Sequence, residues 1–189
     1  MTIKYNNSSN NTVYNFKNKL FFLGGDEHFP NKEGITWFLD NCWAKLNVEN
    51  PGLTLHIIGN WSDESKTKYS NHKNIIFLGF VDSLTDVLKD GIFIVPIRIG
   101  SGMRMKIIDA VLNGVPFVTT TIGVEGLNFE NQIDCLIGDS YSDFSACIQT
   151  LIYNPNLAVQ LVNNARETLF AKYSYERLIT IRKDFYDSF

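Results

Sequence analysis

Residues 96–110 have the sequence PIRIGSGMRMKIIDA, which carries the clearest fold signal in the chain. An apolar run ends here, a glycine-rich turn follows, and the spacing predicts a helix from about Met103 to Leu112. Glycine lets backbone N–H groups approach an anion closely, and a helix N-terminus adds unpaired N–H groups and partial positive charge. A strand, a turn and a helix in this order are typical of a phosphate site in an α/β protein.

The charged side chains of the stretch support the same interpretation. Arg104 and Lys106 add two full positive charges, and we expect them to neutralise a diphosphate. Asp109 lies three residues beyond Lys106 on the same helix face, and a carboxylate there can accept hydrogen bonds from sugar hydroxyls. The stretch therefore suits a nucleoside diphosphate that carries a sugar. The backbone of the turn completes the predicted donor site with Gly100, Ser101, Gly102 and Met103.

A purely structural role and two different nucleotide motifs are the alternatives for this stretch. The glycines alone can serve tight strand–helix packing, with Ser101 as helix cap and Lys106 and Asp109 as an exposed pair worth less than ~0.5 kcal/mol. A dinucleotide fingerprint fails, because its third glycine position is Met105, the strand is the fourth, and no acid ends the next strand. The phosphate loop of ordinary ATPases is absent.

Strand and helix patterns alternate along the whole chain. Apolar runs predict strands at residues 19–24, 53–59, 75–78, 92–96, 116–119 and 135–137. Helices are predicted around residues 31–46 with Asn31 as the cap, 62–70, 83–89, 103–112, 144–152, 157–169 and 174–186. This alternation indicates an α/β fold, a doubly wound Rossmann-like parallel sheet of about six strands with helices on both faces.

Two further strand ends contribute candidate site residues, because ligands of such sheets bind beyond the carboxyl ends of the strands. After the first strand, Gly24 and Gly25 can admit a diphosphate and Lys32 can neutralise it, although a surface loop with a solvated lysine accounts for them equally well. After the third strand, the backbone at Phe80 and Val81 can hydrogen-bond a base edge, with apolar side chains covering the ring.

Composition bounds the remaining possibilities. The 189 residues fit one domain, with residues 1–17 as a polar linker or disordered start and 18–189 as the folded part. A net charge of −3 without a basic block argues against nucleic acid as a partner. Three distant cysteines and no signal peptide or apolar span favour a cytoplasmic location. No Asp-x-Asp pair follows a strand, so we expect a site without metal and without a cofactor.

The ordered motifs resemble those of the group 1 glycosyltransferases, and more specifically the C-terminal, donor-binding half of a GT-B enzyme. The resemblance covers roughly Leu20 to Tyr175. Its most specific part is residues 100–109, GSGMRMKIID. Weaker pieces support it by their order: residues 23–25, 30–31, 37–38, 58–59, 78–81, 95–98, 114–116, 119–120, 123–127, 164–166 and 173–175.

The resemblance implies a retaining, metal-independent, hexosyltransferase-type transfer of a sugar from a nucleoside-diphosphate sugar. The family's Glu-x7-Glu motif corresponds to Ser101 and Asp109, so Asp109 is expected to contact the ribose, while Ser101 replaces the acid that contacts the donor sugar. Many relatives also place an Arg just after the first strand, where this chain has Gly25 and Asp26. Neutralisation then falls to Arg104, Lys106 or Lys32.

The same resemblance implies a partner that this sequence does not contain. GT-B enzymes have two similar domains, and the N-terminal one normally binds the acceptor. We expect the chain to be the other half, with peripheral membrane association possible through the missing domain. Two alternatives remain: a non-catalytic nucleotide-binding module on the same fold, and a GT-B relative that acts as an epimerase or phosphorylase.

Overall fold

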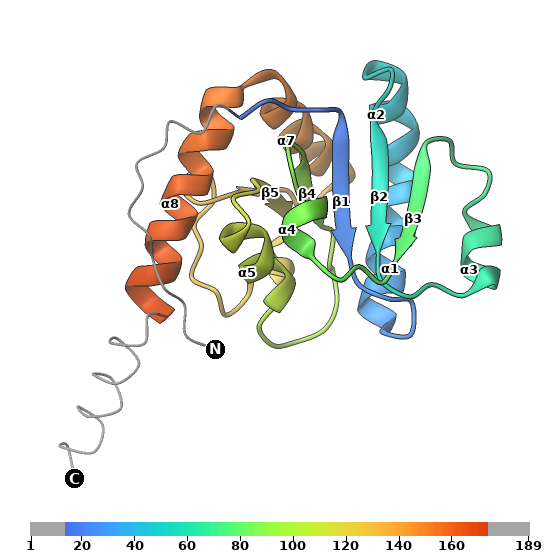
Figure 1. Cartoon of the computed structure of the whole chain (residues 1–189), viewed down its shortest axis with the longest axis horizontal. Coiled ribbons are helices and arrows are strands. Elements are labelled where there is room, and N and C mark those ends of the chain that lie inside the picture. The colour runs from blue at the N-terminus through green and yellow to red at the C-terminus, as the bar shows by residue number, and fades with distance from the viewer. Residues whose placement is uncertain (1–13, 174–189) are drawn as a thin grey trace, which may run out of the picture.

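A six-stranded parallel sheet with helices on both faces forms the body of the protein (Figure 1). The computed structural model describes residues 14–173. The strand order is β3-β2-β1-β4-β5-β6, and every neighbouring pair is parallel. The strands are β1 (Lys19–Leu23), β2 (Thr54–Ile58), β3 (Ile75–Gly79), β4 (Ile92–Val95), β5 (Phe117–Thr119) and β6 (Leu136–Ile137). This arrangement confirms the predicted doubly wound fold.

Alternating side chains of the strands build two cores. Leu20 and Phe22 of β1 point into the first core, and Phe21 between them points into the second. All three are fully buried, as expected for a parallel strand covered on both faces. The apolar runs that predicted the strands are thus explained by burial on both sides.

The first face carries one long helical segment and two further helices (Figure 1). The long segment consists of α1 (Phe29–Phe38), the π-helical turn η1 (Leu39–Trp43) and α2 (Ala44–Glu49). Beside it lie α3 (Asp63–Lys68), whose N-cap Ser62 accepts a bond from the backbone N–H of Ser65, and α7 (Tyr141–Tyr153).

The second face is covered by α4 (Leu84–Val87), α5 (Met105–Leu112) and α6 (Thr121–Val124). The last described helix, α8 (Pro155–Tyr173), contributes to both cores. Its Ala158 and Leu161 pack in the first core, whereas Ala165 and Leu169 pack in the second. The helix therefore wraps the edge of the sheet and joins the two layers.

Most element boundaries agree with the sequence patterns, but the cap predicted for one helix was wrong, and so was the cap offered in the structural alternative for another. Asn31 does not cap α1, because the helix begins at Phe29 and Asn31 lies inside its first turn. Ser101 does not cap α5, which begins at Met105 after Arg104. The predicted end of that helix is confirmed, because Asn113 is its C-cap and Gly114 has a φ of +71°. The predicted helix at 174–186 lies outside the described residues, as do residues 1–13 of the predicted polar start, whereas Tyr14 and Phe16 pack against the first core.

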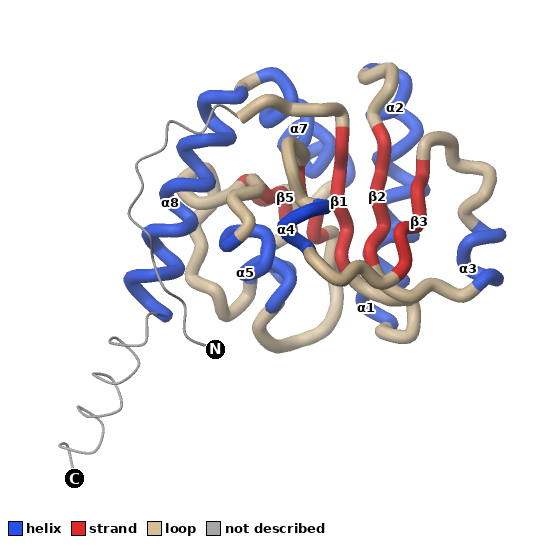
Figure 2. The backbone as a smooth tube through the Cα atoms, in the orientation of Figure 1, coloured by secondary structure: helices blue, strands red, loops and turns tan. Residues whose placement is uncertain are grey.

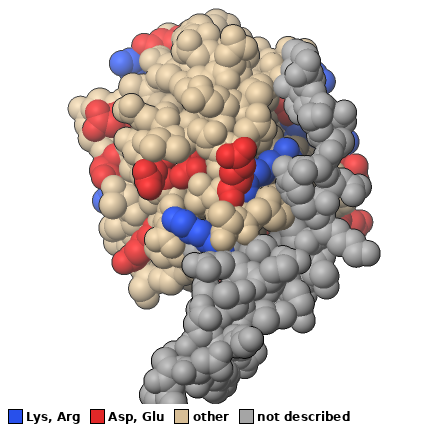
Figure 3. Space-filling view, turned by 90° about the vertical axis from the view of Figure 1, so that its left-hand side faces the viewer, with Lys and Arg blue, Asp and Glu red and all other residues tan. Residues whose placement is uncertain are grey.

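On the face shown in Figure 3, basic and acidic side chains are intermixed. No helix within residues 14–173 is long and apolar enough to cross a membrane.

Candidate functional site

The candidate site lies between β1 and β4, the two central strands from which the chain extends the sheet in opposite directions. From β1 the chain moves outward through β2 and β3, and from β4 it moves outward the other way through β5 and β6. The carboxyl ends of β1 and β4 therefore lead into loops on opposite faces, and at such a switch point doubly wound sheets bind their ligands in the crevice outside the strand ends. We call the space between these two loops the crevice. Figure 2 shows the loops at this lower edge of the sheet. Residues 24–28 and 96–104 form the two loops.

Lys106 connects the two sides of this crevice. Its Nζ donates a hydrogen bond of 2.7 Å to Oδ1 of Asn31 on α1. The same Nζ lies 4.7 Å from the centre of the Phe22 ring, in position for a cation–π contact. Asn31 in turn donates from Nδ2 to the backbone oxygen of Gly25, at 3.1 Å. The structure thus brings together Gly24–Gly25 and Lys106, which are far apart in the sequence.

Arg104 has unused hydrogen-bond donors. Its Nη1 donates to the backbone oxygen of Ser101 at 2.8 Å, which folds the 100–104 turn onto itself. Its Nε and Nη2 are buried and have no hydrogen-bond partner among residues 14–173. A buried donor without a partner costs about 1–3 kcal/mol, so an acceptor that reaches these atoms gains that energy. An anion is the acceptor that suits a guanidinium group best.

Arg104 and Lys106 are not neutralised by any carboxylate in the described part of the chain. Within residues 14–173 neither Arg104 nor Lys106 forms an ion pair with a carboxylate. Burial, and then the charge of Arg104, lower the pKa of Lys106 from its usual value of 10.5 to about 7. Two like charges held together without a counterion create a site that favours an anion.

Because burial and Arg104 make the charged form of Lys106 unfavourable, we expect Lys106→Met to increase the stability of the folded chain. Between about pH 7 and 10.5 the unfolded chain keeps the Lys106 proton that the folded chain loses, so wild-type stability rises with pH across this window. Below about pH 7 Lys106 is charged in both states, so the full cost of burying its charge in the folded chain is present. We expect the variant to be about 2 kcal/mol more stable at pH 7, after the lost Asn31 hydrogen bond is counted. The advantage should vanish towards pH 10.5.

Urea unfolding at pH 6, 7 and 9 measures this effect. The control is Lys45→Met, because Lys45 is exposed on α2 and forms an ion pair with Glu49 one turn further along. We expect the control to change stability by less than about 0.5 kcal/mol at each pH. A Lys106→Met variant that is less stable than wild type at pH 6 contradicts the assignment of a strained cation.

The remaining residues of the predicted turn lie on the exposed side of the crevice. Ser101, Gly102 and Met103 are exposed, and Gly102 has a φ of +91°. A Cβ at Gly100 would lie 3.3 Å from Nη2 of Arg104, so this glycine leaves room for the guanidinium group. The turn therefore keeps open backbone next to the two cations.

Asp109 and Lys32 lie near the cations, but the structure does not join them to Lys106. Asp109 is half-buried one turn further along α5, and burial raises the pKa of its carboxyl. The predicted alternative of a Lys106–Asp109 pair is wrong, because Lys106 bonds to Asn31 instead. Lys32 is half-buried and follows Asn31 on α1.

Phe80 and Val81 lie two strands away from β1, after β3. Val81 packs against the second core, whereas Phe80 is 78% exposed. Two strand spacings amount to about 10 Å. A pocket opens at the same edge, between the ends of β2 and β3, and is lined by Gly59, Asn60, Trp61, Lys66, Phe77, Leu78 and Gly79.

Three contacts that support the site were not found in the sequence. Thr120 donates from Oγ1 to the backbone oxygen of Ile97 and accepts from the backbone N–H of Gly123, which ties the loop after β4 to α6. The run of threonines at 119–121 is the signal that marks this place, but it indicates no partner. The role of Asn31 was missed because its position after Pro30 favoured a cap.

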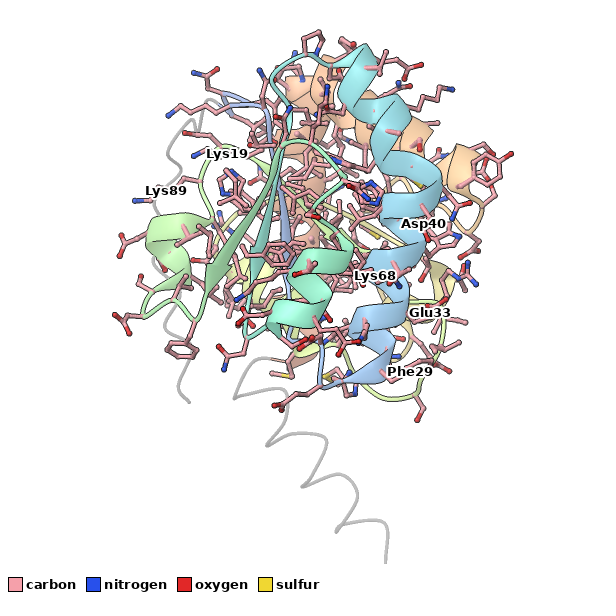
Figure 4. All side chains as sticks on the ribbon, turned by 90° about the vertical axis from the view of Figure 1, so that its right-hand side faces the viewer. Lys19, Phe29, Glu33, Asp40, Lys68 and Lys89 are labelled. Atoms are coloured by element: carbon pink, nitrogen blue, oxygen red, sulfur yellow. The ribbon has the colours of Figure 1, made fainter. Side chains whose placement is uncertain are left out.

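The third contact holds the loop after β4 against α1. Arg98 pairs with Glu33 at 3.3 Å, and its guanidinium carbon lies 5.2 Å from the centre of the Trp37 ring. Figure 4 shows Glu33 on α1, one turn from Phe29 at the start of the helix. The N-terminal part of α1 is thus fixed to both loops of the crevice.

Comparison with known proteins found a matching family model and a curated relative. A family model described as "Glycosyl transferases group 1" matches residues 17–154. An uncharacterized 44.6 kDa protein in the cps region of Klebsiella pneumoniae is 29% identical over 166 residues, which are 82% of this chain and 41% of that protein. The chain therefore spans about two fifths of the length of this curated relative.

Solved structures share the fold. TarM from S. aureus, crystallised with Fondaparinux, alpha-GlcNAc-glycerol and UDP, has a TM-score of 0.77 and 20% identity, over 95% of this chain and 37% of TarM. The C-terminal domain of LpcC, a glycosyl transferase group 1 family protein from Francisella tularensis, has a TM-score of 0.63 and 15% identity, over 83% of this chain and 87% of that domain.

Proposed function

Because this chain belongs to the group 1 glycosyltransferases, we propose that its crevice binds the diphosphate of a nucleoside-diphosphate sugar. In this proposal residues 18–189 are the donor-binding half of an enzyme that transfers a hexose-type sugar with retention. The site works without a metal ion or cofactor, because Arg104 and Lys106 supply the positive charge.

One observation carries the proposal: in the described part of the chain Arg104 and Lys106 lie at the crevice without a carboxylate partner, and two buried donors of Arg104 have no hydrogen-bond partner there. A diphosphate satisfies both demands at once, since its oxygens accept bidentate bonds from a guanidinium group and a further bond from an ammonium group. The exposed backbone of Gly102 and Met103 lies beside the cations and can add N–H donors.

The cations then stabilise the leaving group of the reaction. When the bond between the sugar C1 and the diphosphate oxygen breaks, the electron pair stays on the diphosphate and its negative charge grows. Donors that are already in place for this charge lower the barrier, and removing one typically costs about 3 kcal/mol. Arg104 and Lys106 are the catalytic residues of this proposal.

The nucleoside extends from the diphosphate along the edge of the sheet. Asp109, whose carboxyl is half-buried and unpaired with Lys106, is placed to accept bonds from ribose hydroxyls. The base lies towards β3, about 10 Å away, against the backbone of Phe80 and Val81. UDP is the first candidate, because the TarM structure that shares this fold contains UDP.

The acceptor is held by a second domain of a longer protein. The chain covers 41% of its Klebsiella pneumoniae relative and 37% of TarM, which leaves room for such a domain in both. Exposed apolar side chains at the carboxyl edge of the sheet provide a surface for it, namely Phe29, Phe80, Ile99, Met103 and Met105. Any peripheral membrane contact belongs to that second domain.

Ligand-observed NMR tests the proposal directly. The chain is mixed with UDP, GDP and ADP and with a sugar conjugate of each, and saturation transfer to the ligand is recorded. We expect one diphosphate and its conjugate to bind, and uridine, guanosine and adenosine to bind more weakly than their diphosphates. Nucleosides that bind as well as their diphosphates contradict a site built on the two cations.

A further inference from the structure

The buried amide of Asn31 forms two hydrogen bonds that together span the crevice. Its Nδ2 donates to the backbone oxygen of Gly25 at 3.1 Å, and its Oδ1 accepts from Nζ of Lys106 at 2.7 Å. The orientation of the amide follows from these partners, because an ammonium group has no acceptor and a carbonyl oxygen has no donor. One side chain thus joins the loop after β1 to the helix after β4.

The turn after β1 is shaped around this amide. A Cβ at Gly24 would lie 2.7 Å from Cγ of Asn31 and 2.9 Å from Oδ1. Gly24 also has a φ of +146°, a conformation that other residues rarely adopt. The glycine therefore admits the amide, and the amide has little freedom to move away from Lys106.

The chemistry of the acceptor matters as much as its position. An amide oxygen can hold an ammonium group by a hydrogen bond, yet it carries no charge that would cancel the cation. A carboxylate at the same place would form an ion pair with Lys106 and reduce its attraction for an anion. An apolar residue would leave the ammonium group without this hydrogen bond.

We infer that Asn31 is a positioning residue, whose amide holds the ammonium group of Lys106 at the crevice without neutralising its charge, so that this charge stays available to a nucleoside diphosphate. The inference rests on the proposed function of the crevice. Asn31 need not touch the substrate in this role, because its two hydrogen bonds alone position Lys106.

The charged groups around Lys106 are consistent with this role. Arg104 acts on Lys106 and lowers its pKa further, after the effect of burial. Asp109, on the same helix as Lys106, forms no ion pair with it among the described residues. The loop after β1 and the first turn of α1 carry Asp26, Glu27, His28, Lys32 and Glu33, of which Asp26 accepts from Ser62 and Glu33 pairs with Arg98.

NMR titration of lysine Cε resonances measures the pKa of Lys106 in the free chain, with Lys106→Met providing the assignment. We expect a midpoint of about 7 in the wild type. Asn31→Ala should lower the midpoint by about half a pH unit or more, because the charged form loses its hydrogen bond. Asn31→Asp should raise it by about one unit or more, because a carboxylate favours the charged form.

Binding of UDP-glucose between pH 6 and 9 gives the second readout. Asn31→Asp should bind about tenfold more weakly than the wild type at pH 6, where Lys106 is charged in both, because its charge is already neutralised. As the pH rises, Asn31→Ala should lose affinity for UDP-glucose at a lower pH than the wild type does, because its Lys106 loses the proton earlier. The control is Asn41→Ala, which removes an exposed amide of the same helical segment that bonds only to the backbone of Trp37.

The outcomes separate this inference from the proposed function. A Lys106 midpoint that is the same in wild type, Asn31→Ala and Asn31→Asp overturns the inference, because a packing role alone leaves the pKa unchanged. Midpoints that move in opposite directions, with an unchanged Asn41→Ala control, support it. If the Lys106 midpoints move in this way but neither the wild type nor any variant binds a nucleotide, the proposed function fails while the effect of Asn31 on Lys106 stands.

Discussion

The double variant Arg104→Ala/Lys106→Ala is expected to bind its nucleoside diphosphate at least about 100-fold more weakly than the wild type. Each cation offers the diphosphate charge-assisted hydrogen bonds worth about 1.5–3 kcal/mol, and the variant removes both. The fold should survive, since the two side chains form few internal bonds and Lys106 is strained. Isothermal titration calorimetry measures the affinity, and thermal unfolding reports the fold.

The matched control is Lys45→Ala/Lys89→Ala, which removes the same net charge. Both lysines are exposed and pair with neighbours on their own segments, Glu49 and Asp86. In Figure 4, Lys89 lies well away from Phe29, which marks the edge of the sheet that carries the crevice. We expect the control to change affinity less than threefold at physiological salt, where distant surface charges are screened. Equal losses in both variants would mean that only net charge matters.

The second large effect concerns stability: Gly34→Ala is expected to destabilise the fold by about 1–3 kcal/mol. In an exposed helix the same change stabilises by about 1 kcal/mol, because alanine is the better helix former. Gly34 is buried in α1, however, and a Cβ there would collide with the backbone oxygen of Pro96 and lie 3.1 Å from its carbonyl carbon. Backbone atoms cannot rotate away, so the helix and the loop after β4 must separate.

Urea unfolding gives the size of this effect, and the exposed Asn41→Ala serves as a control on the same helical segment, expected within about 0.5 kcal/mol of wild type. Separation of α1 from the loop after β4 should also weaken diphosphate binding, because Asn31 and Lys106 lie on opposite sides of this contact. A stabilised Gly34→Ala variant would show that the helix approaches the loop less closely than the structure indicates.

The fold could be predicted from sequence because its signal is local and repeated. Runs such as residues 92–95 are β-branched or aromatic throughout, which indicates a strand buried on both faces. Helices such as α7 follow from apolar spacing and a serine cap at Ser140, which accepts from the backbone N–H of Asp143. The short α6 was missed because four residues with a glycine and β-branched side chains carry no helical period.

The site was predictable only as far as residue type and strand end define it. The turn at 100–106 combines glycines and cations in a single stretch, so its chemistry could be predicted without knowing its surroundings. The partner of Lys106 could not be predicted, because Asn31 is 75 residues away in the sequence. Its polar atoms face the crevice only once α1 packs on the sheet. Spacing offered Asp109 only as an alternative partner in an exposed pair, and in the structure Nζ of Lys106 bonds to Asn31 instead.

A crystal structure of the chain with UDP would decide whether the crevice is the diphosphate site. We expect the diphosphate to lie between the loops after β1 and β4, with phosphate oxygens about 3 Å from the guanidinium group of Arg104 and from Nζ of Lys106. We also expect the base to point towards β3. Ordered UDP in another place, such as the pocket between β2 and β3 with no phosphate near Arg104 or Lys106, would contradict this assignment.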